Sequence, residues 1–215
     1  MSALLRIPPI YPILSADVFP GDPCDWARRL VEAGVKFIQY RDKQASALDL
    51  FRAASRLATL SRSLDFRFVV NDRADLAALA GAHGVHVGQE DLPVEAARSI
   101  VGLGCMVGVS THDLDQLRAA AVTSADYIAV GPIFATTTKA NPDPVVGLDF
   151  LRQARTLTEK PLVAIGGITA ERAADVYAAG ADSLAVAADL ANAPNLPARI
   201  IQYLDAFKCQ RPVTP

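Results

Sequence analysis

The sequence contains little cysteine and no long apolar run. Cys24, Cys105 and Cys209 are far apart and show no Cys-x-x-Cys spacing, which argues against a disulfide framework or a structural zinc site. Three prolines between residues 8 and 12 interrupt the apolar N-terminal stretch, and no segment is long enough to span a membrane. We therefore expect a cytoplasmic protein with no membrane partner.

The chain also lacks a block of charge of either sign. The formal net charge is −2, and lysine and arginine are scattered along the sequence, so neither a nucleic-acid partner nor an anionic membrane surface is predicted. Hydrophobic residues make up 51% of the chain and charged residues 20%, a composition far from that of disordered proteins. A chain of 215 residues fits one α/β barrel, so we expect a single domain over residues 1–215 with a frayed tail at 209–215. The oligomeric state stays open.

Short apolar or β-branched runs alternate with longer amphipathic segments along the whole chain. The runs expected to form strands are Ile10–Leu14, Lys36–Arg41, Arg67–Asn71, Gly84–Val87, Met106–Ser110, Asp126–Val130, Leu162–Ile165 and Ser183–Ala187. This alternation is typical of parallel strands joined by helices, and a right-handed helical crossover can follow each run. Eight such units in a chain of this length predict a (β/α)8 barrel, the TIM barrel.

Local signals mark where helices begin and end. Asp22 before Pro23 predicts a capped helix start, and Ser46 three residues before Asp49 resembles a capping box. Glycines at 34, 81 and 180 fall where a helix is expected to end. The longest connection, residues 131–147, follows the sixth strand, and a loop of that length suggests a function.

Barrel enzymes place their chemistry at the carboxyl ends of the strands, so polar residues at those ends are the candidates. Gln39, Arg41 and Lys43 share one parity, and if the second strand runs on through Lys43 all three face the barrel mouth. Two cations and an amide on one face suit an anionic ligand. The alternative is that Asp42 and Lys43 are solvated loop charges.

Two aspartates stand at neighbouring strand ends. Asp72 follows the third strand directly after Asn71, and Asp91 follows the fourth strand. Mg²⁺ prefers oxygen ligands and commonly bridges one or two carboxylates to substrate phosphates, so the pair suggests a metal–diphosphate site. The alternative is that both aspartates are helix N-caps.

The remaining strand ends offer groups that can meet a phosphate. Ser110 follows the fifth strand, where its hydroxyl can bind an anion, cap the next helix, or do both. Thr136, Thr138 and Lys139 in the long loop can close over an anion, or the threonines can bond their own backbone. Gly167 belongs to a Gly-Gly pair after the seventh strand, which allows backbone N–H groups to approach a phosphate or simply makes a tight turn. The histidines at 83, 86 and 112 are not expected to converge on zinc.

Together these motifs resemble those of the thiamine-phosphate synthase family over roughly residues 10–190. The motifs that carry the resemblance are Gln39-Tyr-Arg-Asp-Lys43, Asn71-Asp72, Gly88-Gln-Glu-Asp91, Gly108-Val-Ser110-Thr-His112, Gly131-Pro-Ile-Phe-Ala-Thr136-Thr-Thr138-Lys139 and Ile165-Gly-Gly-Ile168. The resemblance implies a transferase that joins 4-amino-2-methyl-5-hydroxymethylpyrimidine diphosphate to 4-methyl-5-(2-phosphoethyl)thiazole, or to its carboxylated form. The products would be thiamine phosphate and pyrophosphate, and the implied metal is Mg²⁺.

The same resemblance implies a role for each candidate. Gln39 would face the pyrimidine, and Asp72 and Asp91 would hold the metal. The diphosphate would be held by Arg41, Lys43, Asn71, Ser110 and Lys139, of which all but Asn71 are counted as catalytic. The thiazole phosphate would be received by Thr136, Thr138, Gly167 and the backbone N–H groups of Ala187 and Ala188. The family reaction is dissociative, so it needs electrostatic stabilisation of the leaving diphosphate and no protein nucleophile.

One position departs from the family pattern. A serine is usual after the eighth strand, whereas this chain reads Val186-Ala-Ala-Asp189. Ala187 and Ala188 keep their N–H groups but lose the hydroxyl, and an inward-pointing Asp189 would disfavour a phosphate. Two alternatives follow: a thiazole tautomerase-like paralogue that performs proton transfer without diphosphate chemistry, and a non-catalytic ligand-sensing barrel. The retained Lys43, Asp72 and Asp91, together with the Thr-x-Thr-Lys motif at 136–139, favour the synthase.

Overall fold

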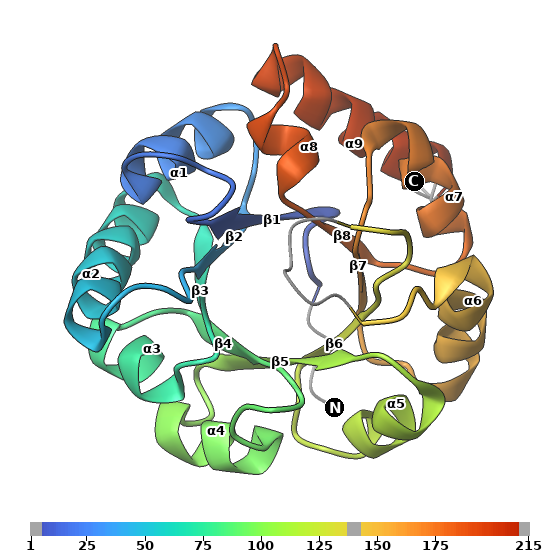
Figure 1. Cartoon of the computed structure of the whole chain (residues 1–215), viewed down its shortest axis with the longest axis horizontal. Helices are drawn as coiled ribbons and strands as arrows, with labels where there is room; N and C mark the ends of the chain where they lie inside the picture. The colour runs from blue at the N-terminus through green and yellow to red at the C-terminus, as the bar shows by residue number, and fades with distance from the viewer. Residues whose placement is uncertain (1–5, 137–142, 211–215) are drawn as a thin grey trace.

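The computed structural model describes residues 6–136 and 143–210. Eight parallel strands close into a barrel in sequence order, and helices surround it (Figure 1). The strands are β1 (Ile10–Ser15), β2 (Phe37–Arg41), β3 (Arg67–Asn71), β4 (Gly84–Val87), β5 (Met106–Thr111), β6 (Tyr127–Val130), β7 (Leu162–Ile165) and β8 (Ser183–Val186). The helices are α1 (Pro23–Glu32), α2 (Ala47–Leu64), α3 (Ala74–Ala80), α4 (Val94–Val101), α5 (Leu114–Ala121), α6 (Gly147–Leu157), α7 (Ala170–Ala178), α8 (Ala188–Ala191) and α9 (Leu196–Gln210). The predicted (β/α)8 barrel is confirmed.

Every run predicted as a strand forms one, with bounds that differ by at most one residue at either end. The agreement has a physical basis, because strands buried on both faces need continuous apolar and β-branched sequence. Residues of odd number in β1 and β2, such as Tyr11, Ile13 and Phe37, point into the barrel, and their neighbours point toward the helices.

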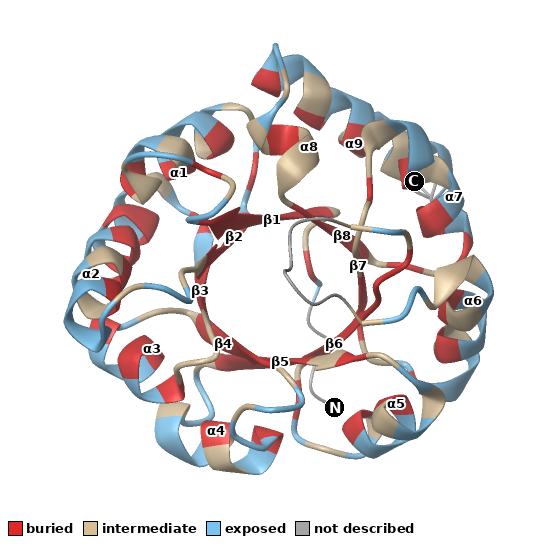
Figure 2. Ribbon diagram, viewed as in Figure 1, coloured by how far each residue is buried: buried red, intermediate tan, exposed pale blue. Residues whose placement is uncertain are grey.

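Two apolar layers hold the barrel together. The inner layer fills the barrel interior and consists of Ile7, Tyr11, Ile13, Phe37, Val69, Met106, Tyr127, Ala129, Val163 and Ala185. The outer layer lies between the strands and the helices, where it includes Leu30, Leu57 and Leu117, each fully buried. Figure 2 shows the result, with buried residues on the strands and on the inward faces of the helices and exposed residues on their outward faces. The interior is therefore a packed core and not an open pore.

The predicted helix signals are confirmed. The Asp22 side chain accepts a hydrogen bond from the N–H group of Cys24 at 2.9 Å, and the Ser46 side chain accepts one from that of Asp49 at 3.2 Å. The expected glycines at 34, 81 and 180 all adopt positive φ angles where helices end.

Two arginine–aspartate pairs tie α4 and α6 to strands further along the chain. The Asp182 carboxylate accepts hydrogen bonds from the N–H group of Leu162 at 2.8 Å and from Arg155 at 2.9 Å. Asp126 makes the equivalent contacts, because its carboxylate accepts hydrogen bonds from Arg98 and, at 2.7 Å, from the N–H group of Val107 in β5. Each aspartate directly precedes a strand, so the pairs fix the amino ends of β6 and β8.

The C-terminal helix closes the ring. Helix α9 packs against α7, and it includes Cys209 and Gln210, two residues that the sequence had suggested for a frayed tail. Residues 211–215 lie outside the described residues. No helix within the described ranges is both long enough and apolar enough to cross a membrane.

Candidate active site

A cleft of about 1270 Å³ opens at the carboxyl ends of the strands. The site residues expected from the sequence line it wherever the structure describes them: Gln39, Arg41, Lys43, Asn71, Asp72, Asp91, Ser110, Thr136, Gly167, Ala187 and Ala188. Thr138 and Lys139 lie outside the described residues. The volume exceeds that of most sites for one small molecule, so the cleft has room for two ligands.

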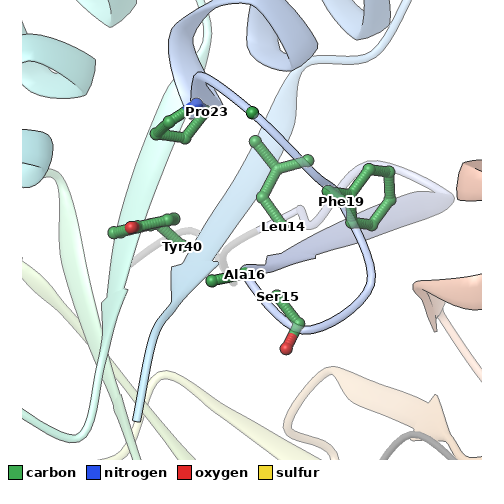
Figure 3. A pocket seen from close by; sticks show the side chains of 7 residues that line it. Leu14, Ser15, Ala16, Phe19, Pro23 and Tyr40 are labelled. Atoms are coloured by element: carbon green, nitrogen blue, oxygen red, sulfur yellow. The ribbon is translucent and has the colours of Figure 1, made fainter. Parts of the chain in front are cut away.

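A second pocket, behind β1, is too small for a substrate. Figure 3 shows Leu14, Phe19, Pro23 and Tyr40 around it, between the end of β1 and the loop that enters α1. Its volume of about 20 Å³ admits a single water molecule. The cleft at the strand ends is therefore the candidate active site.

Lys43 reaches the cleft from a turn. The prediction that the second strand runs on through Lys43 is wrong, because β2 ends at Arg41. The Asp42 carboxylate accepts hydrogen bonds at 3.0 Å from the N–H groups two and three residues further on, which turns the chain. Lys43 nevertheless lines the cleft, with its Nζ 2.9 Å from Oδ2 of Asp72. Lys43 thus lies in a turn with its side chain half exposed, and its ammonium group faces the cleft.

Arg41 is held between the ends of β1 and β2. Its Nη1 donates to the Ser15 hydroxyl at 3.2 Å and lies 3.7 Å from Oδ2 of Asp17. The Arg41 side chain is only 20% exposed, so it is oriented before any ligand binds. Ser15 and Asp17 also line the cleft, although neither was predicted from the sequence to be a site residue.

Neither aspartate of the expected metal pair caps a helix. The residue before α3 is Arg73 and the residue before α4 is Pro93, so the helix-cap alternative is wrong. Asp72 has a φ of 62°, in the left-handed region that favours glycine, at the point where β3 ends. Oδ2 of Asp91 accepts a hydrogen bond from the N–H group of Gly88 at 2.7 Å. Both carboxylates are therefore placed by the strand ends themselves.

The electrostatics of the aspartate pair favour a cation. Burial raises the pKa of Asp72, the ammonium group of Lys43 acts in the opposite direction, and the neighbouring Asp91 carboxyl raises it further. Asp72 thus faces both the Lys43 ammonium and the Asp91 carboxyl, and added positive charge beside the two carboxyl groups would relieve the repulsion between them. Within residues 6–136 and 143–210 no set of three His, Cys, Asp or Glu side chains forms a metal cage. A cation here would complete its shell with water and substrate oxygens, as Mg²⁺ commonly does.

Ser110 is hydrogen-bonded inside the barrel mouth. Its Oγ lies 2.8 Å from Nε2 of His86. The cap of α5 is Asp113, whose side chain accepts a hydrogen bond from the N–H group of Gln116 at 2.8 Å, so the suggestion that Ser110 caps this helix is wrong. The Ser110 hydroxyl is therefore oriented by His86 at the rim of the cleft.

The three histidines serve different elements. Burial lowers the pKa of His86 to about 4, so its imidazole is neutral near pH 7. Nδ1 of His83 accepts a hydrogen bond from the backbone of β3 at 3.2 Å. His112 donates through Nδ1 to the carbonyl of Gly131 at 2.6 Å, and its Nε2 lies 3.6 Å from Asp143. His86 and His112 line the cleft, and His112 contacts the loop after β6 at Gly131 and at Asp143.

The loops after β6 and β7 run side by side. The N–H group of Ile133 donates to the carbonyl of Ile165 at 2.8 Å, and that of Phe134 donates to Gly166 at 3.1 Å. Gly167 has a φ of 60°, and a Cβ atom there would lie 2.3 Å from the carbonyl oxygen of Ala135 in the loop after β6. The Gly-Gly pair is therefore required for the turn and for the close approach of the two loops.

Arg172 links these two loops from the surface of α7. Its Nη1 donates to the carbonyl of Gly167 at 2.7 Å, and its guanidinium lies 4.5 Å from the centroid of the Phe134 ring. Arg172 lines the cleft, although its position on an amphipathic helix gave no signal in the sequence.

Asp189 lines the cleft with its carboxylate already paired. Oδ1 lies 2.9 Å from Nη2 of Arg199, Oδ2 accepts from the hydroxyl of Tyr203 at 2.7 Å, and the side chain is 9% exposed. The nearby Arg199 also contacts Glu171 on α7. The charge that a phosphate would meet at this strand end is thus compensated by a guanidinium.

Basic side chains beside paired carboxylates, with glycine-rich backbone across the same barrel mouth, define a class: barrel enzymes that act on phosphorylated small molecules. Sequence comparison gives the family within this class. Residues 10–190 match the family described as thiamine monophosphate synthase. The chain belongs to this enzyme family.

Individual relatives agree with the family. The chain is 52% identical over 197 residues to the thiamine-phosphate synthase of Koribacter versatilis, a match that covers 88% of this chain and 92% of that protein. It is 46% identical over 163 residues to that of Chloroflexus aurantiacus, covering 74% and 75%. Among solved structures, thiamine phosphate pyrophosphorylase from Pyrococcus furiosus matches with a TM-score of 0.84 at 29% identity, covering 94% of this chain and 96% of that chain.

Proposed function

We propose that this chain joins 4-amino-2-methyl-5-hydroxymethylpyrimidine diphosphate to 4-methyl-5-(2-phosphoethyl)thiazole, or to its carboxylated form, and releases pyrophosphate. The observation that carries the proposal is the convergence of the motif residues on one cleft, where Lys43 lies 2.9 Å from Asp72. The family and the similarity to proteins named thiamine-phosphate synthase support the same reaction.

The half of the cleft formed by β2 to β5 is proposed to bind the diphosphate. Arg41 and Lys43 supply charge, and Asn71 and Ser110 supply hydrogen-bond donors, with Lys139 as a further cation. Asp72 and Asp91 would hold Mg²⁺, which when bound adds positive charge against the leaving oxygens. The presence of two neighbouring carboxyl groups fits this ion, since Mg²⁺ takes one or two protein carboxylates beside phosphate oxygens.

The half formed by β6 to β8 is proposed to bind the thiazole monophosphate. Thr136, Thr138, Gly167 and the N–H groups of Ala187 and Ala188 would receive it. The hydroxyl that a serine would supply after β8 is missing, so backbone N–H groups and the nearby guanidinium of Arg172 are left to compensate.

The proposed reaction needs the two substrates held in position and positive charge beside the leaving pyrophosphate. The bond between the pyrimidine methylene carbon and the diphosphate oxygen breaks, and the electron pair leaves with the oxygen. The lone pair of the thiazole nitrogen then forms the new carbon–nitrogen bond. The groups of this chain act by stabilising the charge that develops on pyrophosphate and by holding both substrates in line.

The test is an assay of the purified chain with both substrates and Mg²⁺. We expect equal amounts of thiamine phosphate and pyrophosphate. Asp72→Asn and Asp91→Asn should each lower kcat by a factor on the order of 10² or more, because each removes a carboxylate that would hold the Mg²⁺ whose positive charge stabilises the leaving group. Asp115→Asn is the matched control, since Asp115 is 94% exposed on α5. The proposal fails if no product forms above a control without enzyme.

The two alternatives give different results in the same assay. A tautomerase-like paralogue would convert a thiazole carboxylate phosphate without releasing pyrophosphate. A ligand-sensing barrel would bind the substrates and release nothing. Near-normal turnover in both aspartate variants would separately rule out the metal role of the pair.

A further inference from the structure

A chain of hydrogen bonds crosses the barrel interior and joins two residues of the cleft. Nε2 of Gln39 donates to the Tyr11 hydroxyl at 2.8 Å, and the Tyr11 and Tyr127 hydroxyls lie 2.9 Å apart. The Tyr127 hydroxyl lies 3.1 Å from Nδ1 of His86, and Nε2 of His86 lies 2.8 Å from Oγ of Ser110. The chain of hydrogen bonds therefore runs from β2 to β5 through side chains of β1, β6 and β4.

The intermediate side chains are buried and fixed. Tyr11 is 1% exposed, Tyr127 0% and His86 7%. The His86 ring stacks on the Tyr127 ring with centroids 5.5 Å apart, and Tyr127 lies edge-on to Tyr11. A Cβ atom on Gly108 would lie 2.0 Å from the Tyr127 ring, so glycine at this position makes the space for the ring. These rings belong to the packed interior, and none of them was expected from the sequence to take part in the site.

The number of protons restricts the directions of these bonds. Burial raises the pKa of Tyr11 and of Tyr127, so each hydroxyl keeps its one proton. A neutral His86 carries one N–H group and one acceptor nitrogen. Each of these three side chains therefore donates a hydrogen bond to one neighbour and accepts one from the other. The chain of hydrogen bonds can then point in either of two directions.

The two arrangements present different groups to the cleft. In the first arrangement, each group donates its hydrogen bond in the direction from Gln39 toward Ser110. His86 then donates to Oγ of Ser110, which leaves the Ser110 proton free for a ligand. At the other end, the side-chain carbonyl oxygen of Gln39 faces away from Tyr11. In the second, Ser110 donates to His86, and the reversed amide of Gln39 turns its NH₂ group away from Tyr11. A phosphate oxygen at Ser110 can only accept a hydrogen bond, so it selects the first arrangement.

We infer that Tyr11, Tyr127 and His86 are positioning residues that couple the two ends: an anion bound at Ser110 obliges Gln39 to present a hydrogen-bond acceptor. This inference rests on the proposed function and deepens it. The proposed substrate carries an exocyclic amino group, a donor, together with a diphosphate, an acceptor. Both ends of that molecule select the same arrangement, whereas an oxo group in place of the amino group would oppose it. Ser110, as an acceptor from His86, is a donor to the ligand and not an activated nucleophile.

A double-mutant cycle tests the coupling with Mg²⁺ and inorganic pyrophosphate as the probe. Gln39→Glu places a carboxylate against the Tyr11 hydroxyl. Because a carboxylate can only accept a hydrogen bond, Tyr11 must donate to it, and this forces the second arrangement. Tyr127→Phe interrupts the chain. We expect Gln39→Glu to weaken pyrophosphate binding, measured by calorimetry, by about tenfold or more beyond its effect in the Tyr127→Phe background. The added charge is the same in both backgrounds, so equal effects of Gln39→Glu would overturn the inference.

A second readout does not need turnover. Nitrogen-15 NMR of labelled histidine distinguishes the two neutral tautomers. We expect the Nε2–H tautomer of His86 in the wild type with pyrophosphate, and the Nδ1–H tautomer in Gln39→Glu even when free. The same tautomer in both proteins would contradict the inference. Absence of thiamine phosphate in the activity assay would instead count against the proposed function, so the two failures are distinguishable.

Discussion

At the scale of single residues, Gly167 shows how the backbone shapes the site. Its φ of 60° and the 2.3 Å approach of a Cβ atom to Ala135 O leave no room for a side chain. Gly167→Ala should therefore destabilise the fold by about 1–3 kcal/mol and displace the loop after β6. We expect the KM for the thiazole phosphate to rise more than that for the pyrimidine diphosphate.

Gly102→Ala is the matched control for this prediction. Gly102 also has a positive φ, of 77°, but no atom lies within 4 Å of its Cβ position. This variant should lose stability through backbone strain alone and keep both KM values. If both variants change the KM for the thiazole phosphate equally, the close approach of the two loops does not matter for binding.

Ser183 offers a gain in stability. Its hydroxyl is fully buried and has no hydrogen-bond partner within the described part of the chain. Ser183→Ala should raise the free energy of unfolding by up to ~1 kcal/mol, because it removes a buried polar group that has lost its hydration. Urea unfolding measures the change, and a clear loss of stability would show that the hydroxyl is satisfied in solution.

At the scale of elements, the arginine–aspartate pairs fix the helices to the strands. Asp182→Ala removes the acceptor of both Arg155 and the N–H group of Leu162. The N–H group of Leu162 would lose its partner and Arg155 would lose its carboxylate, keeping only its bonds to backbone carbonyls, which should cost about 3 kcal/mol. Asp115→Ala breaks an exposed pair within one helix turn and should cost under about 0.5 kcal/mol. Similar losses in the two variants, measured by urea unfolding, would contradict this account.

The elements themselves were predictable from the sequence because the rules that form them are local. Apolar runs and caps such as Asp22 and Ser46 specify strands and helix starts over a few residues. The placement of Lys43 was predicted for the wrong reason, since a turn made by Asp42 brings it to the cleft and not an extended strand.

The parts of the site that the sequence did not predict depend on contacts between distant segments. Asp189 is paired with Arg199 and Tyr203, which lie 10 and 14 positions later on another helix. Tyr11 and Tyr127 are 116 positions apart and meet only when the barrel closes. No local pattern contains these contacts, because the packing of α9 against α8 creates those of Asp189 and closure of the barrel creates that between the tyrosines.

At the scale of the whole molecule, a buried neutral histidine links stability to pH. The pKa of His86 falls from 6.5 to about 4 on folding because burial disfavours the charged imidazolium. Its contribution to stability is therefore complete above about pH 6.5 and is lost as the pH falls toward about 4, and the loss amounts to about 3 kcal/mol. Urea unfolding at about pH 7.5 and about pH 4.5 measures it.

His86→Gln isolates this contribution, because glutamine does not titrate. The carboxyl groups of the protein also titrate in this range, but they do so in both proteins. The wild type should lose more stability than the variant between the two pH values. An equal loss would mean that His86 is protonated in the folded protein.

The whole cleft combines two regions with different chemistry. The carboxyl ends of β2 to β5 bring together the lysine, the arginine and the paired carboxylates, whereas those of β6 to β8 present backbone and the Asp189–Arg199 pair. The proposed function rests on this division, because it would bind the metal and the diphosphate on one side and the monophosphate on the other.

The most direct test is a crystal structure of the chain with Mn²⁺ and pyrophosphate, in which anomalous scattering locates the metal. The account predicts Mn²⁺ between Asp72 and Asp91, with pyrophosphate against Arg41, Lys43 and Ser110. Mn²⁺ bound elsewhere, or pyrophosphate against Gly167 and Ala187, would contradict it.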